Sequence, residues 1–418
     1  MQLRDYQESI STDAAKMLAA HKICYLSMEV RTGKTTTALA AADKYGAKWV
    51  LFLTKKKAIS SIVSDYDNLN PTFKLICTNY EQVYNLSPSY DFDLVILDEA
   101  HSLGQFPTQA ARVKELKDRC VFKPIIYLSG TPTPESYSQL YHQFSISSYS
   151  PFLEWKTFYK WAKDFVTVKK KYYYNREFND YSDANKELVD KFTKHLFISF
   201  TQAEAGFEQE VKEVVLKVRM LESTYKLADY LRKKKVYVGK GGQEILADTA
   251  VKLQNKFHQI FSGTVIDEKK DAICFDHTKA KFIKERFAGQ KIAIFYKFRA
   301  EYIMLVTTFG YDRLTEDPME FNERDDKIFV SQIQSGAMGV NLSTADCLVM
   351  MNIDFSSMLY WQARARLQTK DRQKESIIYW IFSEGGVEEK VYRQVVNKKD
   401  FTLSYFMKEY QIKREAVK

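Results

Sequence analysis

The sequence of 418 residues lacks the features that mark membrane proteins and disulfide-bonded secreted proteins. It has no uninterrupted apolar run long enough to cross a bilayer, and its polar start does not match a secretory signal. Its five cysteines are scattered without the paired spacing of a zinc site or a disulfide framework. We therefore expect a reducing, cytoplasmic location with no membrane association.

Internal repeats, a Pro-rich linker and long low-complexity tracts are also lacking, so the parts of the chain should pack together. Hydrophobic residues make up 45% and charged residues 28%, as in folded globular proteins. The length predicts more than one domain. Lys and Arg outnumber Asp and Glu by 62 to 53, giving a net charge of +9. This excess favours a polyanionic partner but is equally compatible with a mildly basic protein that has none.

Two blocks of the sequence alternate short apolar runs with helical stretches, which is typical of parallel sheets flanked by helices. The expected strands are 23–27, 49–53, 75–78, 94–97 and 125–129 in the first block, and 292–296, 328–331, 348–351 and 377–381 in the second. Between the blocks, helical, aromatic and basic composition replaces the strand pattern. The sequence therefore predicts an α/β fold with domains at 1–140 and 263–418 and a mainly helical insertion at 141–262.

A candidate phosphate-binding segment follows the first expected strand. Gly33-Lys34-Thr35 opens a helix, where backbone N–H groups favour phosphate oxygens. Lys34 would reach the β and γ phosphates of ATP, and the Thr35 hydroxyl would bind Mg²⁺. The remaining candidate ATP-binding residues of this segment are Arg31, Thr32, Gly33 and Thr36. Because Met28 stands where the full pattern has a glycine, the turn should be narrower, and the tripeptide alone also occurs by chance.

Two adjacent carboxylates end the fourth expected strand, in the order Asp98-Glu99-Ala100-His101. Acidic residues at the carboxyl end of a parallel strand face the crevice where nucleotides bind. Asp98 is suited to hold Mg²⁺, and Glu99 to accept a proton from an attacking water. The alternative is that both simply begin a helix, but the phosphate-binding segment at the expected distance favours an NTPase.

These residues resemble the superfamily 2 helicases, since 98–101 spells their DEAH box and 129–132, Ser-Gly-Thr-Pro, is similar to their third motif. The Swi/Snf-type translocases are the most similar branch. The opening 3–7, Leu-Arg-Asp-Tyr-Gln, resembles theirs and implies that Arg4 and Gln7 recognise adenine. Segment 150–161 resembles compact phage-encoded relatives, for which the host cytoplasm would be the location.

The resemblance extends into the second block, where 294–296, 339–342 and 362–366 are similar to motifs IV, V and VI. It implies two RecA-like P-loop NTPase domains, with Gly339 binding ATP and Arg366 as a catalytic arginine finger beside Lys34 and Glu99. Thr369 stands where the family carries a second arginine, so Lys370 or Arg372 would substitute or hydrolysis would slow. The residues expected to couple the nucleotide to domain closure are His101, Ser129, Thr131 and Gln362.

The implied function is an ATP- and Mg²⁺-dependent motor on nucleic acid, with double-stranded DNA as the expected substrate and no protein partner identified. The residues expected to contact its phosphates are Thr54, Lys55, Asn79, Tyr80, Gln332 and Ser335. The alternatives are a strand-separating DNA or RNA helicase and a nucleic-acid clamp that hydrolyses ATP weakly. The basic runs 169–174 and 233–235 could contact nucleic acid or could be solvated faces.

Overall fold

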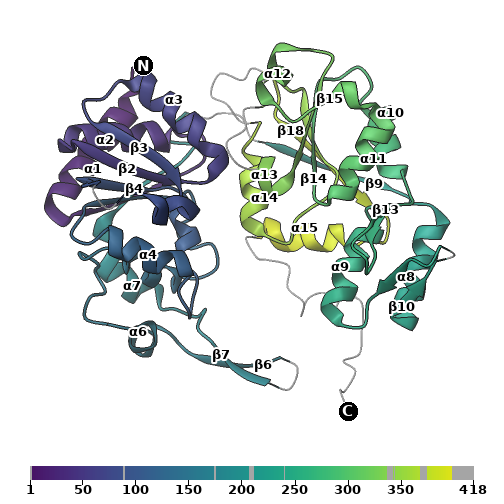
Figure 1. Cartoon of the computed structure of the whole chain (residues 1–418), viewed down its shortest axis with the longest axis horizontal. Helices are drawn as coiled ribbons and strands as arrows, with labels where there is room; N and C mark the ends of the chain where they lie inside the picture. Colours follow the sequence, from purple (N-terminus) through teal and green to yellow (C-terminus); the bar gives the residue numbers. More distant parts are fainter. Residues whose placement is uncertain are drawn as a thin grey trace. The chain divides into compact units, whose positions relative to one another are not determined.

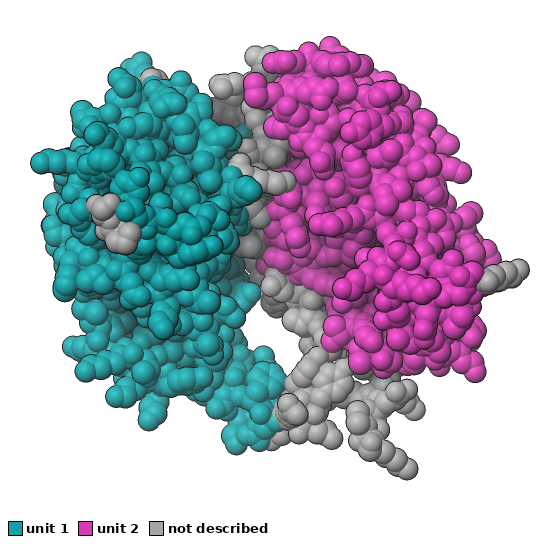
Figure 2. All heavy atoms as spheres, viewed as in Figure 1, with its two compact units in different colours: residues 1–207 teal, residues 208–418 magenta. Residues whose placement is uncertain are grey.

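A computed structural model describes residues 2–87, 90–173, 176–206, 211–239, 241–336, 342, 344–367 and 374–397. The chain divides into two compact units, residues 1–207 and 208–418 (Figure 2). Each unit has its own sheet and its own apolar cores, and each is described by itself.

Unit 1 is built on six parallel strands in the order β3-β2-β4-β5-β1-β8. Figure 1 labels β2, β3 and β4 of this sheet. They are β1 (Ile23–Met28), β2 (Trp49–Thr54), β3 (Lys74–Asn79), β4 (Leu94–Leu97), β5 (Ile125–Leu128) and β8 (Phe197–Phe200). All five strands predicted for this block are confirmed within two residues. Their apolar runs are nearly continuous because helices cover both faces of the sheet.

Helices α1 (Asp5–His21), α2 (Lys34–Tyr45) and α3 (Ile59–Leu69) pack on one face of this sheet. The other face packs against α4 (Ala111–Arg119), α5 (Gln139–Phe144), α6 (Phe158–Phe165) and α7 (Lys186–Thr193). Side chains of each strand alternate between these cores, so that Leu26 joins the first and Tyr25 the second. Short 3₁₀ turns connect the elements: η1 (Lys56–Ala58), η2 (Tyr80–Asn85), η3 (Ala100–Leu103) and η4 (Lys194–Leu196).

Unit 2 repeats this plan with six parallel strands in the order β15-β16-β14-β17-β18-β9. They are β9 (Lys212–Val218), β14 (Ile292–Tyr296), β15 (Leu314–Thr315), β16 (Ile328–Gln332), β17 (Cys347–Met350) and β18 (Ile377–Ser383). The four strands predicted for this block are confirmed. Two antiparallel pairs lie outside the sheet: β10 (Val236–Val238) with β11 (Glu244–Leu246), and β12 (Thr264–Ile266) with β13 (Ala272–Cys274).

One core of unit 2 includes α8 (Glu222–Lys234), α9 (Ala250–Ile260), α12 (Pro318–Glu323), α13 (Ile333–Gly336), α14 (Ser357–Arg364) and α15 (Glu388–Val396). The opposite face of the sheet is covered by α10 (Thr278–Arg286) and α11 (Arg299–Phe309), followed by the turn η5 (Tyr311–Arg313). No helix in the described ranges combines the length and the apolar character that crossing a bilayer requires.

The segment 141–262, which the sequence presents as one helical insertion, is shared between the two units. It supplies an edge strand to each large sheet, because β8 pairs with β1 and β9 pairs with β18. These strands are short or mix polar with apolar residues, so they carry little local signal. The boundaries expected at 140 and 262 therefore differ from the observed division between 207 and 208.

The basic run that begins at Lys169 lies in a strand rather than a helix. β6 (Lys169–Tyr173) pairs antiparallel with β7 (Arg176–Asp180) and projects from unit 1 (Figure 1). Its three lysines each bond a carboxylate: Lys169 with Asp183 at 2.7 Å, Lys170 with Glu177 at 2.6 Å and Lys171 with Asp180 at 2.6 Å. This pairing favours a solvated face. Tyr174 lies outside the described residues.

Candidate nucleotide site

The candidate site of unit 1 lies at the carboxyl ends of three neighbouring strands. β4, β5 and β1 are adjacent and parallel, so the residues that follow them meet at one edge of the sheet. Those residues are Asp98-Glu99 after β4, 129–131 after β5 and 29–33 after β1. The sheet topology thus gathers three separate sequence motifs.

The loop after β1 is a tight turn that leads into α2. Gly33 has a φ of 79°, which favours glycine, and a Cβ placed there would lie 2.2 Å from Gln7 Nε2, so any larger residue would displace the Gln7 side chain. Arg31 also has a positive φ, of 67°. The Thr32 hydroxyl donates to Glu29 O at 2.7 Å, and Lys34 Nζ donates to the same oxygen at 3.3 Å. The loop therefore closes on itself without the glycine that Met28 replaces.

Gln202, just beyond β8, braces this loop from outside. Its backbone N–H donates to Glu29 Oε2 at 2.8 Å, and its Nε2 donates to Val30 O at 3.0 Å. Glu29 N in turn donates to Phe200 O at 2.9 Å. Sequence reasoning missed Gln202 because no local pattern links it to a loop more than 170 positions earlier.

The start of α1 holds the other side of the loop. Tyr6 Oη donates to Thr32 O at 3.1 Å, and Gln7 Nε2 donates to Gly33 O at 3.4 Å. Gln7 Oε1 accepts the Arg4 N–H at 3.0 Å, and Gln7 is 7% exposed. The two residues expected to recognise adenine therefore lie beside the candidate phosphate loop, with Arg4 at the surface.

Asp98 occupies a polar but poorly solvated position at the end of β4. Thr54 Oγ1 donates to its carboxylate at 2.7 Å, and Tyr80 Oη donates to its backbone oxygen at 2.6 Å. Burial, and next the charge of Glu99, raise the pKa of Asp98 to about 6, although the Thr54 hydrogen bond and the Lys34 charge oppose the shift. A carboxylate with these surroundings is suited to bind a cation.

The three coupling residues predicted in unit 1 lie together. His101 Nδ1 is 2.9 Å from Ser129 Oγ and 3.3 Å from Glu99 Oε2. Ser129 Oγ also accepts the Thr131 N–H at 3.1 Å. Burial lowers the pKa of His101, which keeps the ring neutral at physiological pH. Glu99 is thereby connected through His101 to the loop that follows β5.

Two residues expected to contact nucleic acid point inward instead. Thr54 has no exposed surface and Tyr80 is 3% exposed, and both hydroxyls bond Asp98. In this structure both residues support Asp98, and their contact with nucleic acid stays a prediction. Asn79, at 8% exposed, is also largely covered, whereas Lys55 is partly exposed. The sequence could not reveal this, because the direction of a side chain at a strand end depends on its neighbours.

The candidate residues of unit 2 lie at the carboxyl side of its sheet. Gln332, at the end of β16, donates from Nε2 to Lys297 O at 2.8 Å, and Ser335 is partly exposed. Gln362 is 6% exposed, and its backbone oxygen accepts a hydrogen bond from Arg366 Nε at 3.2 Å. Gly339, Thr369, Lys370 and Arg372 lie outside the described residues.

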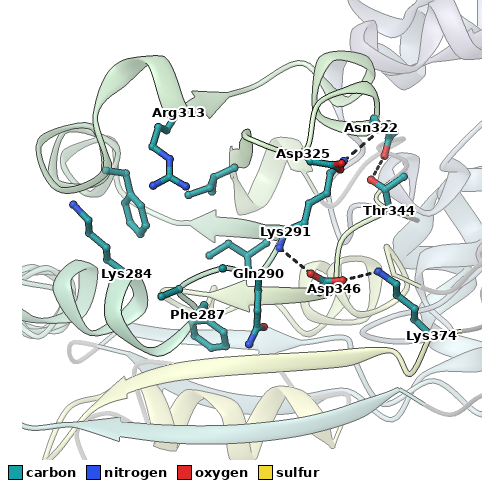
Figure 3. A pocket seen from close by; sticks show the side chains of 15 residues that line it. Lys284, Phe287, Gln290, Lys291, Arg313, Asn322, Asp325, Thr344, Asp346 and Lys374 are labelled. Carbon is teal, nitrogen blue, oxygen red and sulfur yellow. Dashed lines mark hydrogen bonds and ion pairs between the residues drawn. The ribbon is translucent and has the colours of Figure 1, made fainter.

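A pocket of about 730 Å³ lies at the opposite, amino-terminal edge of the unit 2 sheet (Figure 3). It is lined by the first residues of β14 and β16 and by several basic side chains. Lys291 and Lys374, two of these, donate to Asp325 at 3.0 Å and Asp346 at 2.7 Å. In parallel α/β sheets ligands bind at the carboxyl ends of the strands. This pocket lies at the amino-terminal ends, on the other edge of the sheet.

A protein-family model described as the SNF2-related domain matches residues 20–237. The probable ATP-dependent DNA helicase CHR12 of Arabidopsis thaliana is 22% identical over 83% of this chain and 33% of its own length. The CHD3-type chromatin-remodeling factor PICKLE, also of Arabidopsis thaliana, is 21% identical over 82% of this chain and 26% of its own length. The chain thus spans about a third of these relatives or less.

Among solved structures, the SWI2/SNF2 ATPase core of Sulfolobus solfataricus in complex with dsDNA is 15% identical to this chain. The match covers 98% of this chain and 95% of that one, with a TM-score of 0.43.

Proposed function

This chain belongs to the SNF2-related family, and on that basis we propose that it is an ATP-hydrolysing motor that moves along double-stranded DNA. The observation that supports the proposal most is the meeting of three motifs at one sheet edge, after β1, β4 and β5. The name of the relative CHR12 includes a DNA helicase activity, and the net charge of +9 suits a polyanionic track.

We propose the following roles in ATP hydrolysis. Backbone N–H groups of 31–33 and the Lys34 ammonium bind the phosphates, with Thr36 and α2 behind them. Thr35 and Asp98 would hold Mg²⁺, which neutralises phosphate charge when it is bound. Glu99, the second residue of the DEAH box, accepts the proton of the attacking water. Arg4 and Gln7 hold the adenine.

Unit 2 contributes Arg366 as the arginine finger, a guanidinium that stabilises charge on the transferred phosphoryl group. Gly339 is proposed to contact the nucleotide, and Gln362, with His101, Ser129 and Thr131, to report its state. Lys55, Gln332 and Ser335 are proposed to track DNA phosphates, which carry no sequence information. Asn79 stays a candidate for DNA phosphate contact. Because it is 8% exposed, its side chain would have to become more exposed when DNA binds.

The test is ATP hydrolysis by the full chain with duplex DNA, single-stranded DNA, RNA or no nucleic acid. We expect strong stimulation by duplex DNA and loss of hydrolysis in Lys34→Ala. Equal, low turnover under all four conditions would instead support a nucleic-acid clamp. Normal hydrolysis in Lys34→Ala would refute the assigned site.

A second assay separates translocation from unwinding. A translocase displaces the third strand of a triplex without opening the duplex, whereas a helicase releases one strand of a duplex. We expect triplex displacement alone. Release of a duplex strand at a comparable rate would favour the strand-separating alternative.

A further inference from the structure

One carboxylate in unit 2 collects hydrogen bonds from three elements. Glu213 of β9 accepts from Tyr360 Oη at 2.7 Å and Arg364 Nε at 2.8 Å, both on α14. It also accepts from Trp380 Nε1 of β18 at 2.8 Å and from Tyr392 Oη of α15 at 3.0 Å. Four donors on one carboxylate fix the orientation of the groups around it.

The ion pair in this cluster is shielded from water. The side chains of Arg364 and Glu213 are 26% and 13% exposed, and Arg364 Nη2 also donates to Val211 O at 3.4 Å. Its guanidinium lies 5.3 Å from the centroid of the Trp361 ring. A shielded, multiply bonded pair resists rearrangement more than a solvated one does, because separation would leave a charge in a poorly solvated place.

The geometry of α14 divides its residues between two faces. Tyr360 and Arg364 are four positions apart, so they lie on one face, the face that meets Glu213. Gln362 is two positions from each, a rotation of about 200°, which places it on the roughly opposite face. Arg366 follows the helix and bonds back to Gln362 O at 3.2 Å. Arg366 is thus tied to the end of a helix whose other face is held by Glu213.

We propose that Glu213 is a positioning residue that holds the rotation of α14 and thereby aims Arg366. This inference rests on the proposed role of Arg366 in ATP hydrolysis. β9 is the first element of unit 2, and Gln202, near the end of unit 1, holds the phosphate loop through two hydrogen bonds. The two ends of the connection between the units thus each hold an element proposed to act on the nucleotide.

The first experiment compares two variants of the full chain that each remove one hydroxyl from the same carboxylate. Tyr360→Phe frees α14 from one contact, whereas Tyr392→Phe removes the equivalent contact from α15. We expect Tyr360→Phe to lower kcat for DNA-stimulated ATP hydrolysis about 3–10-fold with KM for ATP within twofold, and Tyr392→Phe, which removes no contact between Glu213 and α14, to lower kcat less than about twofold. Equal effects of the two variants would overturn the proposal.

The second experiment removes the charge. Glu213→Gln is expected to lower kcat about 10–100-fold with little change in KM, since misplacing a catalytic group by about 1 Å can cost this much. The matched control is Glu375→Gln. Glu375 is exposed and lies 3.7 Å from Lys212, the neighbour of Glu213 on β9, so this variant also removes one negative charge beside that strand. A normal kcat in a folded Glu213→Gln protein would overturn the proposal, and thermal unfolding reports whether the variant folds. If it does not fold, the tyrosine pair decides.

Epistasis distinguishes positioning from general stability. In an Arg366→Ala background, Tyr360→Phe and Glu213→Gln should change the residual single-turnover rate by less than about twofold, because the group they position is gone. Multiplicative effects would show that Glu213 does not act through Arg366. If the unmodified chain hydrolyses ATP and Lys34→Ala does not, such a result rejects this inference alone. If the unmodified chain has no ATPase activity, the proposed function fails and this inference fails with it.

Discussion

Asp98 and Glu99 are neighbours in sequence but have different surroundings. The Asp98 carboxylate faces Thr54, whereas Glu99 has a φ of 50°, which non-glycine residues rarely adopt, and its carboxylate lies 3.3 Å from His101. The backbone at Glu99 therefore turns two consecutive carboxylates towards different partners. This separation allows one to hold a cation while the other accepts a proton.

Glu99→Gln tests the proton-acceptor role. The amide keeps the shape of the side chain but cannot take a proton from water, so we expect kcat to fall about 10²–10⁴-fold while ATP binding persists. The exposed Glu81→Gln should behave as the unmodified chain. Steady-state hydrolysis and nucleotide titration measure the two quantities, and a kcat within threefold of normal would reject Glu99 as the base.

Asp98→Asn should stabilise the nucleotide-free protein at pH 7.5. Because the folded pKa of Asp98 is raised to about 6, the folded state holds this proton more tightly than the unfolded state does. Stability from this group is present below pH 4 and is lost as the pH rises through 6. We expect Asn to recover about 1–3 kcal/mol at pH 7.5 and close to nothing at pH 3.5, below the unfolded pKa. Denaturant unfolding at both pH values measures this, and a less stable variant at pH 7.5 would contradict it.

At the scale of elements, the phosphate loop is held by parts of the chain far from it in sequence. α1 bonds Thr32 and Gly33 from one side, and the segment after β8 bonds Glu29 and Val30 from the other. α2 begins at Lys34 with no side-chain cap at Gly33. The N–H groups of its first turn are thereby suited to bind an anion.

Gly33→Ala and Gly46→Ala form a matched pair at the two ends of α2. Both glycines have positive φ, 79° and 83°, but a Cβ on Gly46 meets nothing within 4 Å. Each variant should lose about 1–2 kcal/mol from backbone strain. Gly33→Ala should in addition displace Gln7 and weaken ATP binding at least tenfold, whereas Gly46→Ala should bind ATP normally. Equal ATP affinities, measured by calorimetry, would contradict the model of the loop.

Gln202→Ala should raise KM for ATP about 2–10-fold, the effect of losing roughly one hydrogen bond to Val30 O. Its backbone bond to Glu29 remains, so the loop should loosen rather than collapse. Gln82→Ala, an exposed change on η2, is the control. A KM that Gln202→Ala leaves unchanged would show that the loop does not depend on this brace.

For the whole molecule, each sheet is enclosed by cores drawn from its own unit. In unit 1 the core that contains Trp161 and Val189 also contains residues of β1, β4 and β5. Removing the segment after 140 would therefore expose one face of this sheet and leave β1 as an open edge. The units, rather than the blocks of strand pattern, are the parts expected to fold.

A truncation series tests this division. A chain ending at 207 should unfold cooperatively and bind ATP, but it should lack DNA-stimulated hydrolysis because Arg366 is missing. A chain ending at 140 should aggregate. Calorimetry and light scattering measure both outcomes, and a folded, soluble 1–140 fragment would restore the boundary expected from the sequence.

The sequence by itself determined most strands of both parallel sheets, and it placed the Gly-Lys-Thr tripeptide and the pair of carboxylates directly after two of them. Each of these depends on neighbouring residues, through apolar runs such as β4 or through a tripeptide at the start of α2. Local patterns of this kind can be recognised without knowing which distant residues contact them. They sufficed for the fold class, and the proposal of unit 1 as the nucleotide-binding part rests on them.

Only the tertiary structure decided which distant residues meet. Three hydrogen-bonded contacts illustrate this: Gln202 with the candidate phosphate loop, Thr54 with Asp98, and Glu213 with α14. The residues in each contact are from 44 to more than 170 positions apart in the sequence. Edge strands β8 and β9 are defined in the same way, by the strands beside them. Such contacts depend on how whole surfaces pack. The hydrophobic periodicity of a short sequence window therefore cannot predict them.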